Sequence, residues 1–180
     1  MKILRVRTWL CARRAEMLFE LFQARFVFLN AALISATALV VALGAQYFYN
    51  IQPCELCVWQ RWPYAAALLL SLAGFFVMLA YRRALLLLLA LAFAAGAGLA
   101  FFHVGVEQHW WQGLAGCVGN ISAAENATQL LNEIMGQMNI IRCDEVNWAF
   151  AGISMTVWNT ALSVVLCLYA LASWGRYDNR

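Results

Sequence analysis

The sequence predicts an all-α membrane protein, a four-transmembrane-helix bundle. The chain of 180 residues is 64% hydrophobic and 12% charged, with a mean hydropathy of +0.70, whereas soluble domains carry about 25% charged residues. Four stretches without Asp, Glu, Lys or Arg reach the roughly 18 to 20 residues needed to cross a bilayer. These predicted spans are 26–48, 62–81, 84–106 and 153–174. The chain is therefore expected to form a single integral membrane domain.

Helices are the expected form of these spans. In hydrocarbon every backbone N–H and C=O needs an internal partner, and the Leu/Ala-rich stretch 84–100 shows no two-residue alternation that would indicate a strand. The first apolar run, 26–48, follows a basic segment, so a cleaved signal peptide is the alternative. Its length exceeds the usual 7 to 15 residues of a signal core, and no A-x-A-type site follows it. We expect the segment to remain as an anchoring helix.

The basic residues predict the orientation of the bundle, because Lys and Arg near the ends of spans are retained in the cytoplasm. Ten of the twelve fall on one side of the predicted spans: Lys2, Arg5, Arg7, Arg13, Arg14, Arg25, Arg82, Arg83, Arg176 and Arg180. Both termini are therefore predicted to be cytoplasmic, with a short first outer loop at 49–61 and a long second one at 107–152. This asymmetry explains the net charge of +3, and no nucleic acid partner is expected.

Four of the six cysteines fall in the two outer loops. Cys54 and Cys57 lie in the short loop, and Cys117 and Cys143 lie in the long one. Oxidising compartments use thiols differently from reducing ones, so their placement bears on function. The other two, Cys11 in the basic tail and Cys167 within the last span, are expected to be incidental.

The C-x-x-C pair Cys54/Cys57 predicts thiol–disulfide exchange, because it can close a small reducible ring and one of its thiols often has a lowered pKa. Half of a zinc site would look the same in isolation. Pro63 fits the first turn of the second span, which would bring a helix N-terminus near Cys57 and favour a thiolate there. Arg61 follows Cys57 by four residues. It either reaches lipid phosphates or holds charge beside the thiolate and donates to a carbonyl oxygen such as that of a quinone.

The long loop has a helix signal of its own. The segment Ser122-Ala-Ala-Glu125 is typical of a capping box, and apolar residues at helical spacing follow it. The predicted helix either packs on the bundle or lies on the bilayer surface. In both cases Cys117 and Cys143 flank it, and the connection is expected to swing.

Two segments together resemble the disulfide bond formation protein B (DsbB) family, a bacterial inner-membrane family that works with the periplasmic oxidant DsbA. One is Pro53-Cys-x-x-Cys-x-x-Gln-Arg61, and the other is Cys143-x-Glu-x-x-Trp-x-Phe-x-Gly-x-x-Met-x-x-Trp158. The resemblance covers essentially the whole chain. It implies a thiol:quinone oxidoreductase that reoxidises a DsbA-like thioredoxin-fold protein and passes the electrons to ubiquinone or menaquinone dissolved in membrane lipid.

The resemblance also implies roles for particular residues. Cys54 and Cys57 would be the quinone-coupled pair, with Cys57 nearest the ring, and Cys117 and Cys143 would be the pair that meets DsbA. Arg61 would contact the quinone.

His103, near the outer end of the third span, resembles a histidine found there in many relatives and would share a proton with the quinone. The alternative is a satisfied polar anchor. Gln60 departs from the family pattern, since many members have an acidic residue before the arginine, and the surroundings of Cys117 match little beyond the cysteine. This leaves the choice of partner less determined than the chemistry.

Two rival functions follow from other arguments. A four-span scaffold of tetraspanin type would also have a small and a large outer loop, but it needs permanent disulfides and gives no reason for a C-x-x-C pair beside Arg61. A zinc site made of all four outer cysteines would need a second closely spaced pair, and Cys117 and Cys143 are far apart in sequence. We expect no metal site.

Overall fold

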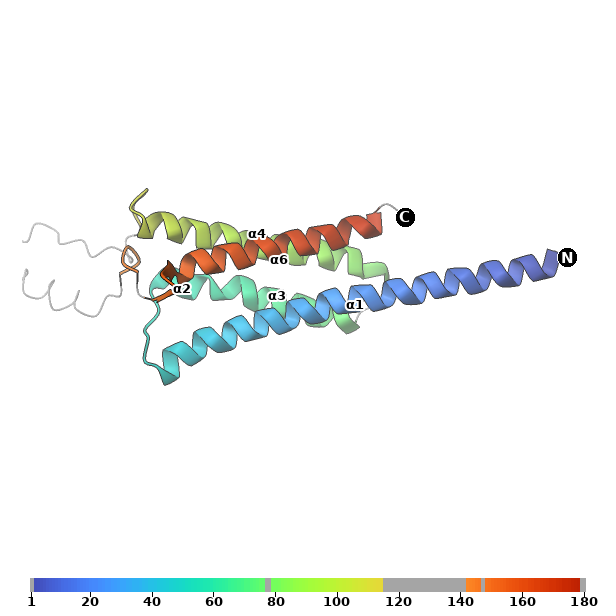
Figure 1. Cartoon of the computed structure of the whole chain (residues 1–180), viewed down its shortest axis with the longest axis horizontal. Coiled ribbons are helices and arrows are strands. Elements are labelled where there is room, and N and C mark those ends of the chain that lie inside the picture. The colour runs from blue at the N-terminus through green and yellow to red at the C-terminus, as the bar shows by residue number, and fades with distance from the viewer. Residues whose placement is uncertain (1, 77–78, 115–141, 147, 179–180) are drawn as a thin grey trace, which may run out of the picture.

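The computed structural model describes residues 2–76, 79–114, 142–146 and 148–178. Four long helices run beside one another in this part of the chain: α1 (Lys2–Phe48), α3 (Arg61–Phe76), α4 (Leu79–Glu107) and α6 (Met155–Asp178) (Figure 1). A five-residue helix, α2 (Glu55–Trp59), precedes α3. Two short strands, β1 (Ala149–Phe150) and β2 (Ile153–Ser154), precede α6.

The helices are joined mainly through three contacts: α4 with α6, α1 with α3, and α3 with α4. Contact between α1 and α6 is slight. Buried apolar side chains from all four helices form the core, among them Phe28, Ala67, Phe93 and Leu166. Gly74 allows α3 to approach α1 closely, because a Cβ at this position would lie 2.4 Å from the ring of Phe28.

The outward surface of the helices is apolar. Leu69 and Val165 are 69% and 61% exposed, which a water-soluble protein avoids over so large an area. Within the described residues, the segments Arg25–Phe48, Tyr81–Glu107 and Met155–Arg176 are long and apolar enough to cross a membrane. The chain is therefore a multi-pass membrane protein.

The second predicted span differs from its prediction. α3 is described from Arg61 to Phe76, and Tyr81 already belongs to α4, which begins at Leu79. The absence of charge between 62 and 81 could not reveal that α4 begins within this stretch, because both helices are equally apolar there.

The fourth span begins two residues later than predicted. Ile153 and Ser154 pair with Phe150 and Ala149 in an antiparallel hairpin, whose turn has positive φ angles at Ala151 and Gly152. A two-residue turn of this kind matches the twist of the flanking strands. The hairpin ends where α6 starts, at Met155.

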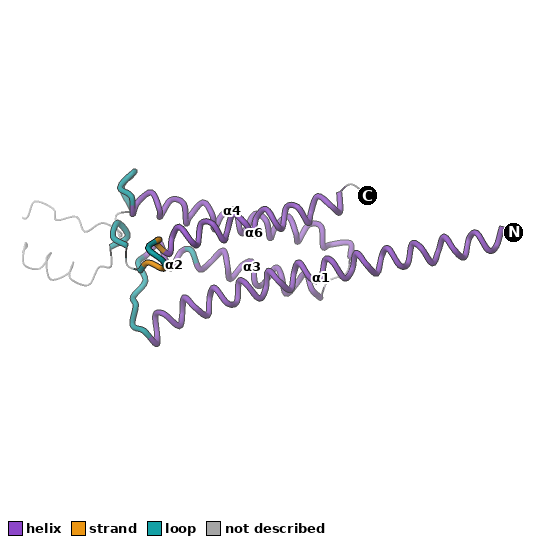
Figure 2. Tube along the Cα trace, in the orientation of Figure 1, coloured by secondary structure: helices purple, strands orange, loops and turns teal. Residues whose placement is uncertain are grey.

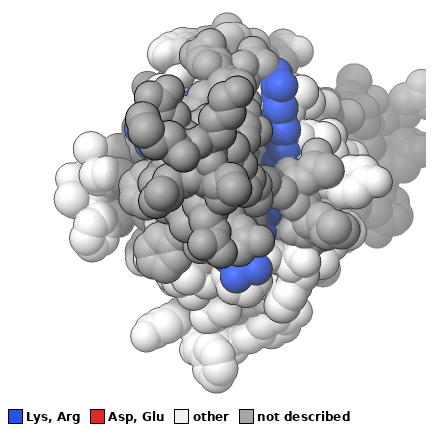
Figure 3. Space-filling view, turned by 90° about the vertical axis from the view of Figure 1, so that its right-hand side faces the viewer, with Lys and Arg blue, Asp and Glu red and all other residues white. Residues whose placement is uncertain are grey.

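The two ends of the bundle differ in composition. The termini lie at one end, and α2 and the hairpin lie at the other (Figures 1 and 2). Seen from the end with the termini, the described surface shows arginine but no aspartate or glutamate (Figure 3). Arg82 and Arg83 lie in the first turns of α4, and Arg176 lies near the end of α6. The predicted helix that begins near Ser122 lies outside the described residues.

Candidate functional site

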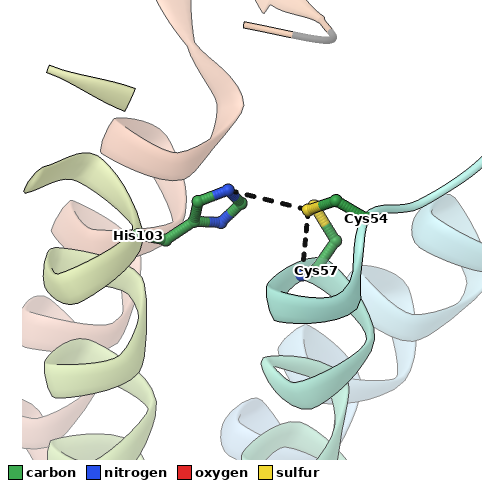
Figure 4. Close-up of side chains that lie close together, drawn as sticks. All are labelled: Cys54, Cys57 and His103. Atoms are coloured by element: carbon green, nitrogen blue, oxygen red, sulfur yellow. Dashed lines mark hydrogen bonds between the residues drawn. The ribbon is translucent and has the colours of Figure 1, made fainter. Parts of the chain in front are cut away.

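Cys54 and Cys57 lie together at the end of the bundle opposite the termini. Cys54 is the N-cap of α2, with φ −70° and ψ 170°, and its Sγ accepts a hydrogen bond from the backbone N–H of Cys57 at 3.3 Å. Both cysteines are free, and their Sγ atoms are 2.8 Å apart. His103 of α4 faces the same sulfur, with Nε2 3.6 Å from Cys54 Sγ (Figure 4). The pair can therefore close a disulfide with little backbone movement.

The two thiols of this pair are inequivalent. The hydrogen bond with Cys57 and, to a smaller extent, His103 lower the pKa of Cys54 from 9.0 to about 5, against the opposing effect of burial. The same hydrogen bond raises the pKa of Cys57, and burial raises it again. The two thiols therefore titrate as a coupled pair, in which Cys54 is the more acidic member.

This assignment differs from the expectation that a helix N-terminus favours a thiolate at Cys57. The separate helix α2 lies between the cysteines and α3, and Cys54 occupies its N-cap position. Pro63 does lie in the first turn of α3, as predicted. The helix whose N-terminus Cys54 caps, however, is α2.

Cys143 lies next to this pair. It is completely buried, at 0% exposure, in a cluster with Cys54, Leu56 and Val106. Cys143 is disulfide-bonded. Cys117, the predicted partner of Cys143, lies outside the described residues. The structure therefore places Cys143 in the same buried cluster as Cys54.

A cavity of about 550 Å³ opens beside the cysteine pair, along the seam where α1 and α6 make little contact. Its walls are largely apolar, with Leu33, Ala38 and Val41 on α1 and Leu162 on α6. Ligand pockets for small organic molecules commonly have volumes of about 300 to 1,000 Å³ and walls of this kind.

The end of the cavity nearest α2 is polar. Its lining residues there are Cys57, Gln60, Arg61, His103 and Glu107. Among the described residues that line the cavity, Cys57 is present and Cys54 is not. Of the pair, Cys57 is therefore the member that faces the cavity.

Arg61 is turned into the protein. Its Nη1 donates to Oε1 of Gln46 on α1, at 2.7 Å, and the side chain lines the cavity while half-buried. A role only as an anchor to lipid phosphates does not account for this bond. Gln46, which holds the guanidinium, was not identified from the sequence, because a glutamine near the end of an apolar helix gives no distinctive signal.

Glu107, the last residue of α4, is a buried carboxylate in the same cavity. Its Oε2 accepts hydrogen bonds from the hydroxyl groups of Ser154 and Thr156. The sequence analysis assigned Glu107 only to the outer loop. Its spacing of four residues from His103, which puts both on one face of a helix, is the signal that would have indicated it.

His103 is linked to α6 through Gln60. Nε2 of Gln60 lies 2.8 Å from Nδ1 of His103, and Oε1 of Gln60 accepts from Asn159. His103 is only 2% exposed. Gln60 and Asn159 were also missed as site residues, because their proximity depends on how α2, α4 and α6 pack.

Cys167 is free and packs against the apolar core of the bundle, far along α6 from the cysteine pair. The side chain of Cys11 is outside the description. Within the described residues, the groups that can act together are thus Cys54, Cys57 and Cys143 with the polar end of the cavity.

Comparison with known proteins places the chain in one family. Residues 24–173 match the family model described as "Disulfide bond formation protein DsbB". Disulfide bond formation protein B of Xanthomonas campestris pv. campestris (strain 8004) is 30% identical over 158 residues, which cover 82% of this chain and 88% of that protein. Disulfide bond formation protein B of Xylella fastidiosa (strain 9a5c) is 29% identical over 154 residues, covering 79% and 85%. With its membrane-spanning helices and its paired cysteines, this chain belongs to the DsbB family of oxidoreductases in disulfide bond formation.

Proposed function

We propose that the chain is a thiol:quinone oxidoreductase of the bacterial inner membrane, which reoxidises a DsbA-like periplasmic protein and delivers its electrons to ubiquinone or menaquinone. The observation that carries this proposal is that three cysteines gather beside the cavity. Cys143 is buried in one cluster with Cys54, and Cys57 packs against that cluster. Cys57 lies 2.8 Å from Cys54, sulfur to sulfur, and lines the cavity. Thiol–disulfide exchange among these residues therefore takes place next to a site for an organic acceptor.

The cavity has the properties that a quinone requires. Its apolar walls suit a ring with an isoprenoid tail, and its opening along the α1–α6 seam suits entry from lipid. Arg61 supplies N–H donors for a carbonyl oxygen, and its bond to Gln46 fixes their direction. Arg61 and His103 are the residues that would hold the polar edge of the ring. When bound, quinone supplies an acceptor for two electrons and two protons.

The proposed exchange begins when a partner thiolate attacks Cys117, so that the Cys117–Cys143 bond breaks and Cys143 is freed. Cys143 then attacks Cys54, and the Cys54–Cys57 bond breaks with Cys57 as the leaving thiolate. The partner's second thiol displaces Cys117, which re-forms its bond to Cys143 and releases Cys54. Oxidation of the Cys54/Cys57 pair restores its disulfide, and two electrons leave through Cys57 into the cavity. The partner's two thiol protons balance the reduction of quinone to hydroquinone.

The direction of electron flow follows from redox potential. DsbA is a strong oxidant, with a potential of about −120 mV, so that only a more oxidising acceptor regenerates it. Exchange between thiols alone would not regenerate oxidised DsbA. The organic acceptor is therefore needed in addition to both cysteine pairs.

Quinone reduction by purified protein with a reduced thiol donor tests the proposal. The wild-type protein should reduce quinone, and Cys57→Ser should abolish this. Cys167→Ser is the matched control, because Cys167 is a free cysteine packed in the core away from the cavity, and it should keep wild-type turnover. Wild-type turnover in Cys57→Ser would refute the proposed function.

Cys117 is proposed as the disulfide partner of Cys143 and as the residue that meets DsbA. Support comes from the free state of Cys54, Cys57 and Cys167, while Cys143 is bonded. Cys143→Ser should accumulate a mixed disulfide through Cys117 with one periplasmic protein, because the resolving thiol is then missing. Absence of any adduct, with Cys117 still required for activity, would contradict the proposed order.

The proposed orientation places both termini in the cytoplasm. It is supported by the basic surface at the end of the bundle that carries the termini (Figure 3). In reduced spheroplasts, a membrane-impermeant thiol reagent should label the outer-loop residue Cys117 and not Cys11. Labelling of Cys11 would invert the orientation and place the cysteine pairs in a reducing compartment.

A further inference from the structure

We propose that Gln60 and Asn159 are positioning residues that fix the tautomer of His103, so that its imidazole faces the cysteine pair as a hydrogen-bond donor and not as a base or a metal ligand. The inference deepens the proposed function, and rests on it in taking Cys54 and Cys57 as the redox pair. It arises from a line of hydrogen bonds that crosses the bundle.

The line begins in the core and ends at a sulfur. The hydroxyl of Tyr64 on α3 donates to Oδ1 of Asn159 on α6, at 2.7 Å. Nδ2 of Asn159 donates to Oε1 of Gln60, the C-cap of α2. Nε2 of Gln60 meets Nδ1 of His103 at 2.8 Å, and Nε2 of His103 meets Cys54 Sγ at 3.6 Å.

The direction of these bonds determines where the imidazole proton resides. An amide nitrogen can only donate, and an amide oxygen can only accept. Since Oδ1 of Asn159 accepts from Tyr64, its NH₂ faces Gln60, and the oxygen of Gln60 is used in accepting it. The NH₂ of Gln60 therefore faces His103, whose Nδ1 has to accept and carries no hydrogen. The hydrogen of the ring is then on Nε2, the atom that faces Cys54.

Cys54 consequently faces two N–H donors. Its sulfur accepts from the backbone N–H of Cys57 and from Nε2 of His103. Donors of this kind stabilise a thiolate at the sulfur they face. The line of bonds thus gives Cys54 a donor that comes from a different helix.

The same line disfavours a competing use of these groups. The ligand atoms of Cys54, Cys57 and His103 lie within 4.8 Å of one another, close enough to hold a metal ion. A metal requires a bare Nε2, and histidine ligands usually donate their other N–H to an acceptor. Gln60 offers Nδ1 a donor instead, so the wild-type site is set for a thiolate at the expense of metal binding.

Gln60→Glu reverses the last step. A carboxylate only accepts, so it draws the ring hydrogen to Nδ1 and leaves Nε2 bare toward the sulfurs. Many relatives have an acidic residue at this position by the resemblance described above, which makes the substitution a natural one. Asn159→Leu removes the middle of the line, and Thr160→Val is its matched control, because Thr160 bonds only the backbone of its own helix and does not line the cavity.

The first readout is the ¹⁵N spectrum of histidine-labelled reduced protein, with the two histidines, His103 and His109, assigned by a His109→Gln variant. Wild-type and Thr160→Val proteins should show the hydrogen of His103 on Nε2. Gln60→Glu should move it to Nδ1, and Asn159→Leu should give a mixture. A wild-type His103 with its hydrogen on Nδ1 would overturn the proposal.

The second readout is binding of Cd²⁺, followed by the thiolate-to-metal absorption of the reduced protein. Carboxylate support of a histidine ligand typically changes metal affinity about 10- to 100-fold, so Gln60→Glu should bind Cd²⁺ more tightly by about that factor, while Thr160→Val should not differ from wild type. If Gln60→Glu does not fold, Tyr64→Phe, which removes only the hydroxyl that donates to Asn159, should give mixed His103 tautomers. Unchanged tautomer and Cd²⁺ affinity in the folded variants would refute the positioning role.

Neither readout depends on turnover with quinone. Failure of the proposed function would appear as quinone reduction that survives Cys57→Ser, with the tautomer unaffected. Failure of the present inference would appear in the spectra, with quinone reduction still dependent on Cys57.

Discussion

Arg61 is the residue whose replacement most directly tests the quinone site. Its guanidinium is half-buried in the cavity lining and is held by Gln46 through one nitrogen, at 2.7 Å. The planar fork has further N–H donors, which can serve a carbonyl oxygen in the cavity. We expect Arg61→Met to weaken quinone binding while the exchange between thiols continues.

The magnitude follows from the type of bond. A hydrogen bond to a charged group contributes about 1.5 to 3 kcal/mol, and each 1.4 kcal/mol is about tenfold in affinity. Arg61→Met should therefore raise the apparent KM for quinone about 10- to 100-fold. The quinone KM of Arg61→Lys should lie between those of the wild type and Arg61→Met, because lysine keeps the charge without the planar fork of donors.

The assay is quinone reduction by purified protein with a thiol donor, titrated in quinone, beside a quinone-free measurement of thiol exchange at the cysteine pairs. Arg83→Met is the control, since Arg83 lies in the first turns of α4, at the far end of the bundle from α2 (Figure 1). A wild-type quinone KM and turnover in Arg61→Met would show that Arg61 only anchors the helix, and His103 would be the next residue to change.

Three further predictions concern the cysteine pair and the packing of the bundle. Because the pKa of Cys54 is lowered from 9.0 to about 5, its alkylation by iodoacetamide in the reduced protein should persist down to about pH 5. The stability that this thiolate contributes should be fully present above pH 9 and lost as the pH falls toward 5. A midpoint of the alkylation rate near pH 9 would contradict the assignment. The hydrogen bond with Cys54, burial and the charge of Glu107 all raise the pKa of Cys57. Glu107→Gln should therefore speed alkylation of Cys57 at a given pH. An unchanged or slower rate would count against this coupling. Gly74→Ala should destabilise the bundle by about 1 to 3 kcal/mol through overpacking against Phe28, which would appear as a lower Tm in detergent. Gly98→Ala is the control and should not lower Tm, because its added Cβ meets nothing within 4 Å. Equal Tm values for the two variants would refute the close contact at Gly74.

Part of this molecule followed from the sequence alone. Uninterrupted apolar stretches predicted the helices now seen in α1, α4 and α6, because a bilayer imposes a length and a composition that few soluble helices meet. The C-x-x-C spacing predicted that Cys54 and Cys57 would lie together, since three residues of one short segment cannot separate them far. The family motifs predicted the membership that the comparisons show.

Other features were decided by the tertiary structure. The start of α4 at Leu79 and the hairpin before α6 depend on packing and pairing that an apolar composition does not encode. How far the Cys54 thiolate is stabilised depends on two donors, of which His103 comes from a different helix. Gln60 and Asn159 are 99 positions apart, and glutamine and asparagine are ordinary residues at any helix end. Their significance arises only when the folded bundle aligns their amides, because a hydrogen bond requires the two groups to be within about 3 Å and correctly directed.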